Sequence, residues 1–136
     1  MIKFIVGKKG TGKTNKLIAE VNEAVKTDKG HLVFINDSGR HMFDLDSKVR
    51  LVDTQEYAIA NYDALYGMIC GILSQDYDIS TIFVDSVTKI VKGGDINAAE
   101  EAFAGIAEVC EKHDADMIIT ASIDEADVPE YMKKYI

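Results

Sequence analysis

Arginine is scarce in this sequence. Only Arg40 and Arg50 occur among its 136 residues, and the formal net charge is −8. Kinases that act on nucleoside monophosphates clamp two phosphorylated substrates and neutralise the transition-state charge with several arginines, so two arginines do not favour that class. The acidic chain also offers no basic stripe of the kind that binds nucleic acid, so we do not expect a nucleic-acid partner.

Cysteine is also scarce, and long apolar runs are absent. The two cysteines, Cys70 and Cys110, lie in helix-forming stretches without metal-ligand spacing, so we expect free thiols in a reducing compartment. No apolar run approaches the length of a membrane span, and the first residues lead into an expected strand rather than a signal peptide. These observations predict one cytoplasmic domain over residues 1–136, with no membrane partner.

The sequence does contain a phosphate-binding loop. Residues 7–14 read Gly-Lys-Lys-Gly-Thr-Gly-Lys-Thr and match the pattern Gly-x-x-x-x-Gly-Lys-Ser/Thr at every position. An apolar β-type run at residues 2–6 precedes the loop, and residues 15–26 behind it have the apolar spacing of a helix. Strand, glycine loop and helix are the context that this motif requires.

Each residue type in this loop has a chemical role in binding a polyphosphate. Glycines allow a tight turn that brings backbone N–H groups close to phosphate oxygens, and the helix start adds its free N–H groups. Lys13 is expected to reach the β- and γ-phosphates, and Thr14 to offer its hydroxyl to Mg²⁺. The other loop positions expected to bind the nucleotide are Gly7, Gly10, Thr11 and Gly12.

Positive charge gathers at the same end of the chain. Residues 1–30 contain seven lysines and three carboxylates, a net charge of +4, so the remaining residues carry −12. A positive surface around the loop suits a polyphosphate ligand. Lys8 and Lys9 are not fixed positions of the motif, and we interpret them as solvated loop lysines.

A second informative segment, residues 80–85, reads Ser-Thr-Ile-Phe-Val-Asp. An apolar strand that ends in an aspartate is a Walker B pattern, in which Asp85 holds Mg²⁺ directly or through water, opposite Thr14. The alternative interpretation makes Asp85 the N-cap of a helix over residues 87–91. The sequence leaves both roles open.

Strands and helices alternate along the rest of the chain. Apolar runs predict strands at residues 31–35, 49–52 and 115–122. Apolar stripes predict helices at residues 55–75 and 97–113, and a short last helix is expected at residues 130–136. Capping boxes at Asp53 and Asn97 are expected to begin the two longer helices. The alternation predicts an α/β protein with a three-layer, doubly wound, mostly parallel sheet that binds ligands at the carboxyl edge of its strands.

Residues 7–14 and 81–85 together resemble the P-loop NTPase superfamily, and the resemblance covers essentially the whole chain. Residues 83–88, Phe-Val-Asp-Ser-Val-Thr, are similar to the Walker B strand and the following Ser-x-Thr of the RecA/KaiC-like ATPase branch. The resemblance implies the RecA-like strand order, in which the last strand lies between the loop strand and the Walker B strand. It also implies that Thr120 or Ser122, at the polar end of that last strand, senses the γ-phosphate.

The chain departs from this family at the position that orients the attacking water. Many such ATPases carry a glutamate directly after the Walker B aspartate, where this chain has Ser86. The RecA-like branch instead places a glutamate just past the second strand, where this chain has Asp37, a shorter carboxylate that an ordinary turn explains equally well. The sequence therefore predicts an ATP–Mg²⁺-binding protein with weak or partner-dependent hydrolysis, in which Lys13, Asp37 and Thr120 carry the catalysis.

Two other functions stay open. A non-catalytic nucleotide-dependent switch or assembly subunit would bind ATP and let a second copy or a protein partner complete the site. A small-molecule phosphotransferase would need a second substrate pocket, which the sequence does not locate. No residue reads the base directly, and ATP is expected because the GTPase Asp-x-x-Gly and the guanine-reading Asn-Lys-x-Asp are absent.

Overall fold

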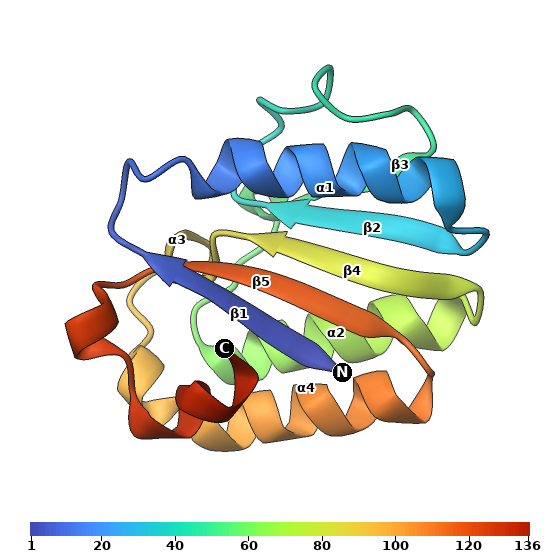
Figure 1. Ribbon diagram of the computed structural model, residues 1–136. Coiled ribbons are helices and arrows are strands. Elements are labelled where there is room, and N and C mark those ends of the chain that lie inside the picture. The colour runs from blue at the N-terminus through green and yellow to red at the C-terminus, as the bar shows by residue number, and fades with distance from the viewer.

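The computed structural model describes residues 1–136 and contains one five-stranded sheet in which every neighbouring pair of strands is parallel (Figure 1). The strands are β1 (Ile2–Gly7), β2 (His31–Asn36), β3 (Val49–Asp53), β4 (Ile79–Asp85) and β5 (Asp116–Ser122). Their order in the sheet is β1-β5-β4-β2-β3, so β5 lies between β1 and β4. The α/β class and a parallel sheet are confirmed, and the order agrees with the one that the sequence resemblance implies.

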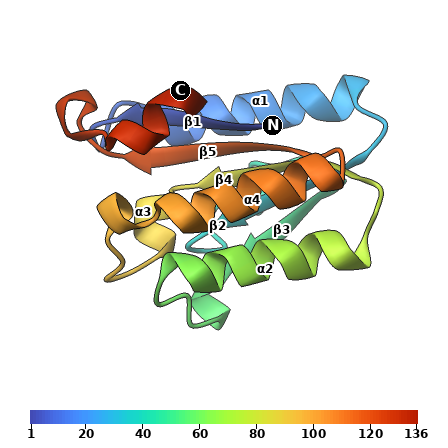
Figure 2. The same cartoon turned by 90° about the horizontal axis from the view of Figure 1, so that it is seen from below.

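Helices cover both faces of this sheet. Helix α1 (Lys13–Thr27) lies on one face, while α2 (Tyr62–Gln75) and α4 (Glu100–Lys112) lie side by side on the other (Figures 1 and 2). The short helix α3 (Val87–Ile90) follows β4 directly. Single-turn or short 3₁₀ helices occupy Thr54–Glu56, Ile96–Ala98, Glu125–Asp127 and Glu130–Tyr135. The arrangement is compatible with the predicted three-layer fold.

The larger part of the core lies between the sheet and the helices α2 and α4. Phe103 of α4 is fully buried, and its ring meets Phe4 edge-on at 5.0 Å and Tyr62 at 5.5 Å between centroids. A smaller cluster under α1 contains Leu17 and Phe34, both fully buried. Because both faces of the sheet are buried, its strands appear in the sequence as continuous apolar runs rather than as alternating ones.

Replacing Phe103 with alanine is expected to lower the free energy of unfolding by about 3–5 kcal/mol, because the change leaves a cavity between aromatic rings in the larger core. Phe43, whose side chain is 91% exposed, provides the matched control. Phe43→Ala is expected to change the free energy of unfolding by less than about 0.5 kcal/mol. Urea denaturation measures both variants, and equal losses would contradict the packing around Phe103.

The helix predicted over residues 55–75 is wrong at its start. Asp53 does accept a backbone hydrogen bond, but only a single 3₁₀ turn follows it. The α-helix begins at Tyr62, because Asn61 supplies the N-cap and its side-chain oxygen accepts from the backbone N–H of Ala64 at 2.8 Å. The capping box in the sequence therefore marks a turn rather than the helix.

The helix predicted over residues 97–113 also begins later, at Glu100. Asp95 is the residue that caps, because its carboxylate accepts from the backbone N–H of Asn97 at 2.9 Å and holds a 3₁₀ turn ahead of the helix. The short last helix expected at residues 130–136 is a 3₁₀ helix. None of these differences changes the order or direction of the strands.

Both cysteines are free, as predicted. Cys110 is fully buried in the larger core, and this burial raises the pKa of its thiol to about 11. A thiol that ionises so late is a poor nucleophile at neutral pH. None of the helices combines the length and the apolar character needed to cross a lipid bilayer.

Candidate functional site

The glycine-rich loop lies at the carboxyl edge of the sheet, where residues 8–12 connect the end of β1 to the start of α1 (Figure 1). Gly10 and Gly12 have φ angles of +85° and +81°, which side-chain-bearing residues rarely adopt. A cavity of about 380 Å³ opens beside this loop, and no hydrophobic side chain lines it. The loop glycines thus shape a polar cavity, as anion binding requires.

Lys13 is held over the loop by neutral oxygen atoms. Its Nζ donates to the backbone carbonyls of Gly7 at 2.9 Å and Lys8 at 2.7 Å, and to the Thr11 hydroxyl at 3.2 Å. Partial burial lowers the pKa of Lys13, although the Asp85 carboxylate acts in the opposite direction. No carboxylate contacts the ammonium directly, so its charge is available to an anion in the cavity.

Asp85 is the centre of a buried hydrogen-bond network and is only 2% exposed. The Thr14 hydroxyl lies 3.1 and 3.0 Å from the two carboxylate oxygens. Thr120 donates to Oδ1 at 2.7 Å and the Asn36 amide donates to Oδ2 at 3.1 Å. The interpretation of Asp85 as a helix N-cap is wrong, because Ser86 is the N-cap of α3 and Asp85 is hydrogen-bonded elsewhere. The first turn of α1 and the carboxyl ends of β2, β4 and β5 therefore meet at one carboxylate.

The donor set at this point fits a hard divalent cation. The Thr14 hydroxyl and the Asp85 carboxylate offer oxygen ligands, which Mg²⁺ prefers over nitrogen or sulfur. Asn36 and Thr120 are fully buried and hold the carboxylate from behind. Such outer partners orient a ligating side chain, so the carboxylate is fixed before any ligand arrives.

Hydroxyl groups connect the ends of β4 and β5 on the other side of the cavity. Ser86 Oγ lies 3.1 Å from Thr88 Oγ1 and 3.5 Å from Ser122 Oγ. The backbone N–H of Ser122 donates to Thr88 Oγ1 at 3.3 Å. These contacts hold the polar end of β5 against α3, where Ser122 lines the cavity.

The structure brings most of the predicted site residues to one place. The predicted residues that line the loop cavity are Gly10, Gly12, Lys13, Thr14, Asp85 and Ser122. Gly7 and Thr11 are not part of its lining and contact the lysine ammonium instead. Thr120 is fully buried and reaches the cavity only through the carboxylate to which it donates. Asp37 lines a neighbouring cavity rather than this one.

Sequence reasoning missed several residues of the site. Asn36 is the most informative of them, because it is fully buried and donates to Asp85. Its signal was present, since it is a polar residue that ends an apolar strand at the same edge of the sheet. Lys89 and His41 also line the loop cavity, although no motif marks them. Arg40 lines it as well; from the sequence it is interpreted as a solvated loop arginine, with an arginine finger toward a neighbouring subunit as the alternative.

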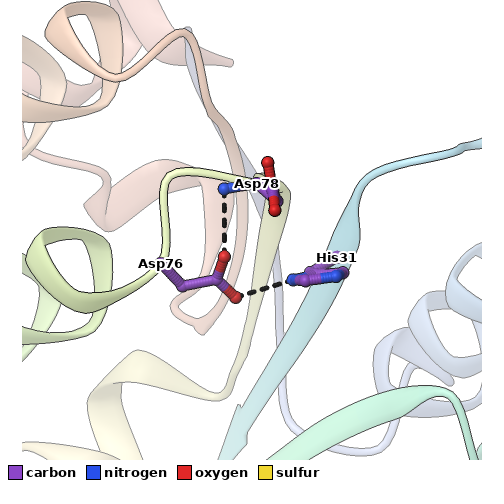
Figure 3. A group of neighbouring side chains, drawn as sticks. All are labelled: His31, Asp76 and Asp78. Atoms are coloured by element: carbon purple, nitrogen blue, oxygen red, sulfur yellow. Dashed lines mark hydrogen bonds and ion pairs between the residues drawn. The ribbon is translucent and has the colours of Figure 1, made fainter.

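A separate group of His31, Asp76 and Asp78 lies at the opposite edge of the sheet, and Figure 3 shows His31 pointing toward Asp76. His31 Nδ1 is 2.7 Å from Asp76 Oδ2, and Asp76 Oδ1 accepts from the backbone N–H of Asp78 at 3.0 Å. The hydrogen bond raises the pKa of His31 and lowers the pKa of Asp76. This geometry is that of an exposed ion pair, which stabilises the protein only when both groups are charged.

The His31–Asp76 pair is expected to make stability depend on pH. Its contribution is complete between about pH 4 and about pH 6.5, the ordinary pKa values of the two groups. It is lost as the pH rises through the raised pKa of His31, and also as the pH falls through the lowered pKa of Asp76. His31→Asn should therefore lose more stability at pH 6 than at pH 8.5 in urea denaturation. His113→Asn is the control, since His113 stacks on Tyr77, and equal pH dependence in both variants would contradict the pair.

Comparison with known protein families gave no matching family model, and comparison with curated proteins gave no match. The basis for a functional proposal is therefore the site itself. Its informative parts are the glycine loop, the available lysine and the buried carboxylate.

Proposed function

We propose that this chain binds ATP and Mg²⁺ as a P-loop NTPase of the RecA/KaiC-like type, and that its hydrolysis is weak or depends on a partner. The observation that best supports this proposal is the distance of 3.0 Å between Thr14 Oγ1 and Asp85 Oδ2, beside the glycine loop. In P-loop NTPases the threonine of the loop and the aspartate of the Walker B strand are both metal ligands, and here 71 positions separate these two residues in the sequence. The position of β5 between β1 and β4 supports the RecA-like branch.

In this proposal each residue of the site has a defined role. Lys13 binds the β- and γ-phosphates, with the loop N–H groups around them. Thr14 and Asp85 hold Mg²⁺, which when bound offsets the negative charge on the β- and γ-phosphate oxygens. Ser122 is the polar group of β5 that lines the cavity and meets the γ-phosphate. Thr120 acts indirectly, by positioning the Asp85 carboxylate through a 2.7 Å hydrogen bond.

The proposal of weak hydrolysis is supported by the acidic groups around the loop. Asp85 is the one carboxylate that lines the loop cavity, and a metal ligand is not free to orient water. Asp37, the expected substitute, lines the adjacent cavity, and its Oδ1 is 3.7 Å from Nη2 of Arg40. A second copy or a protein partner that adds a carboxylate or an arginine would complete the site.

Thermal unfolding with nucleotides tests the binding part of the proposal. ATP with Mg²⁺ at a hundredfold excess over its dissociation constant is expected to stabilise the chain by about 2.7 kcal/mol. EDTA should reduce this stabilisation, because it removes Mg²⁺. The same measurement with GTP shows whether the chain prefers adenine or guanine. If neither nucleotide raises the melting temperature at millimolar concentration, the proposal fails.

ADP release by the dilute chain is expected to be slow, on the order of 10⁻⁴ to 10⁻³ s⁻¹, as in NTPases that lack a completing arginine. Turnover per chain should rise with protein concentration if a second copy completes the site. A coupled assay over a wide concentration range measures both. Fast turnover that stays constant on dilution and is lost in Asp37→Asn would contradict the partner-dependent part and make Asp37 the water-orienting group.

A further inference from the structure

The loop cavity contains a second half-buried lysine, Lys89, which comes from α3 and not from the glycine loop. Val87 and Ile90, the first and last residues of α3, are buried in the larger core. Their burial turns the two middle residues of this single turn, Thr88 and Lys89, away from the core, and both are half-buried. The packing of α3 therefore holds Lys89 at the wall of the cavity.

The ammonium group of Lys89 has no partner in the chain. Lys13 donates to oxygen atoms of the loop, and Arg40 lies 3.7 Å from Asp37, whereas the side chain of Lys89 makes neither a hydrogen bond nor an ion pair. Asp85, the one carboxylate that lines the cavity, is hydrogen-bonded to the side chains of other residues. All donors of Lys89 are therefore available to a ligand in the cavity.

Positive charge exceeds negative charge at the loop cavity. Four lysine and arginine side chains line it against one carboxylate, so its formal charge is +3, whereas the whole chain carries −8. Partial burial lowers the pKa of Lys13, and, against the opposing effect of Asp85, the charge of Lys89 lowers it further. Two ammonium groups that repel each other are stabilised together by one polyanion that contacts both.

Contacts of α3 place Lys89 beside the end of β5. The residue before it, Thr88, accepts a hydrogen bond from the backbone N–H of Ser122 at 3.3 Å. Thr88 Oγ1 is also 3.1 Å from Ser86 Oγ, which lies 3.5 Å from Ser122 Oγ. Lys89 therefore enters the cavity from the side on which Ser122 lies, whereas Lys13 lies over the glycine loop. Ser122 is the group that we propose to meet the γ-phosphate, so Lys89 lies on the γ-phosphate side.

We propose that Lys89 binds the γ-phosphate and thereby makes the chain discriminate ATP from ADP. This inference rests on the proposed ATP binding. The lysine acts as a compact positive charge on the terminal phosphate, which ADP lacks. Lys13 reaches both the β- and the γ-phosphate, so it contributes to the binding of both nucleotides. A nucleotide-dependent switch requires such a difference in affinity, because a ligand shifts an equilibrium only through differential binding.

Isothermal titration with ATP and with ADP, both with Mg²⁺, tests this proposal. Lys89→Gln is expected to weaken ATP binding at least about tenfold and ADP binding less than about twofold, because only ATP loses a charged hydrogen bond. Lys13→Ala is expected to weaken the binding of both nucleotides. Lys92→Gln is the matched control, since Lys92 is exposed shortly after α3 and is absent from the lining of the loop cavity. Neither affinity is expected to change by more than about twofold in this control.

Two further measurements separate phosphate binding from a structural role of Lys89. The urea midpoint of ligand-free Lys89→Gln is not expected to fall, because the side chain has no partner to lose and the change removes its repulsion of Lys13. Lys89→Arg keeps the positive charge and is expected to keep the preference for ATP over ADP. A lower urea midpoint together with equal weakening of both nucleotides would make Lys89 a packing residue and overturn the proposal.

The outcomes for Lys89 and for the nucleotide site are distinguishable. Equal weakening of ATP and ADP by Lys89→Gln, or no weakening of either, would overturn the assignment of Lys89 to the γ-phosphate. If the wild-type chain binds nucleotide and Lys13→Ala does not, the proposed function stands even when Lys89→Gln has no effect. A wild-type chain that binds neither nucleotide would overturn both.

Discussion

Replacing Lys13 with alanine is expected to abolish the stabilisation that ATP and Mg²⁺ give the wild-type chain. The lysine Nζ donates to the carbonyls of Gly7 and Lys8 at 2.9 and 2.7 Å, so it is already positioned over the loop. Charge-assisted hydrogen bonds to phosphate are about twice as strong as neutral ones, and we expect their loss to weaken binding at least about a hundredfold. A nucleotide concentration that stabilises the wild type by about 2.7 kcal/mol would then stabilise the variant by about 0.4 kcal/mol.

Lys16→Ala is the matched control for this experiment. Lys16 is exposed on α1 and is absent from the lining of the loop cavity. Its replacement removes one positive charge from the chain, as Lys13→Ala does, without touching the cavity. ATP affinity in this variant is expected to stay within about twofold of the wild type. Differential scanning calorimetry with and without nucleotide measures both variants. A full nucleotide-dependent melting shift in Lys13→Ala would show that the loop is not the phosphate site.

The sheet could be predicted from the sequence because burial on both faces leaves a strong local signal. In β2, Val33 and Phe34 point to opposite faces and are both buried, one in each core cluster. The run of apolar residues is therefore unbroken, as in other sheets covered on two sides. The loop motif is visible in the sequence because its residues are adjacent in the chain, whereas its binding of phosphate stays a prediction.

The helix starts could not be predicted, because the sequence offers competing caps. Asp53 and Asn61 are both good N-cap residues and both accept a backbone hydrogen bond. Asn61 begins the α-helix because the chain must first leave the end of β3 and reach the face that α2 covers. That requirement belongs to the tertiary structure and leaves no local pattern.

The different positions of Asn36 and Asp37 at the end of β2 could not be predicted from the sequence for a similar reason. Asn36 is the last residue of β2, and Asp37 lies in the bend that follows it. Asn36 meets Asp85, whereas Asp37 faces the neighbouring cavity. The sequence shows two polar residues after an apolar run, but it does not show that the strand ends between them. The pairing of Asn36 with Asp85 in the register of β2 and β4 brings only the first of them to the carboxylate.

Asp85→Ala is expected to lower the free energy of unfolding of the ligand-free chain by about 2–6 kcal/mol. The carboxylate accepts from Asn36 and Thr120, both fully buried, and each donor left without an acceptor costs about 1–3 kcal/mol. Thr14 is only partly buried and can turn its hydroxyl to water. Urea denaturation measures the loss, and Asp127→Asn, at an exposed position, is expected to show none larger than about 0.5 kcal/mol.

Asp85→Asn separates the structural role of this side chain from the role toward Mg²⁺ that we propose for it. The amide keeps the volume and one acceptor oxygen, so this variant is expected to retain more stability than Asp85→Ala. It loses the negative charge that attracts the cation, so EDTA should change its ATP affinity by less than about twofold, against at least about tenfold in the wild type. If EDTA weakens ATP binding equally in both proteins, Asp85 does not hold the metal. The 3.0 Å approach of Thr14 to Asp85 would then be a packing contact, while the loop remains tested independently through Lys13.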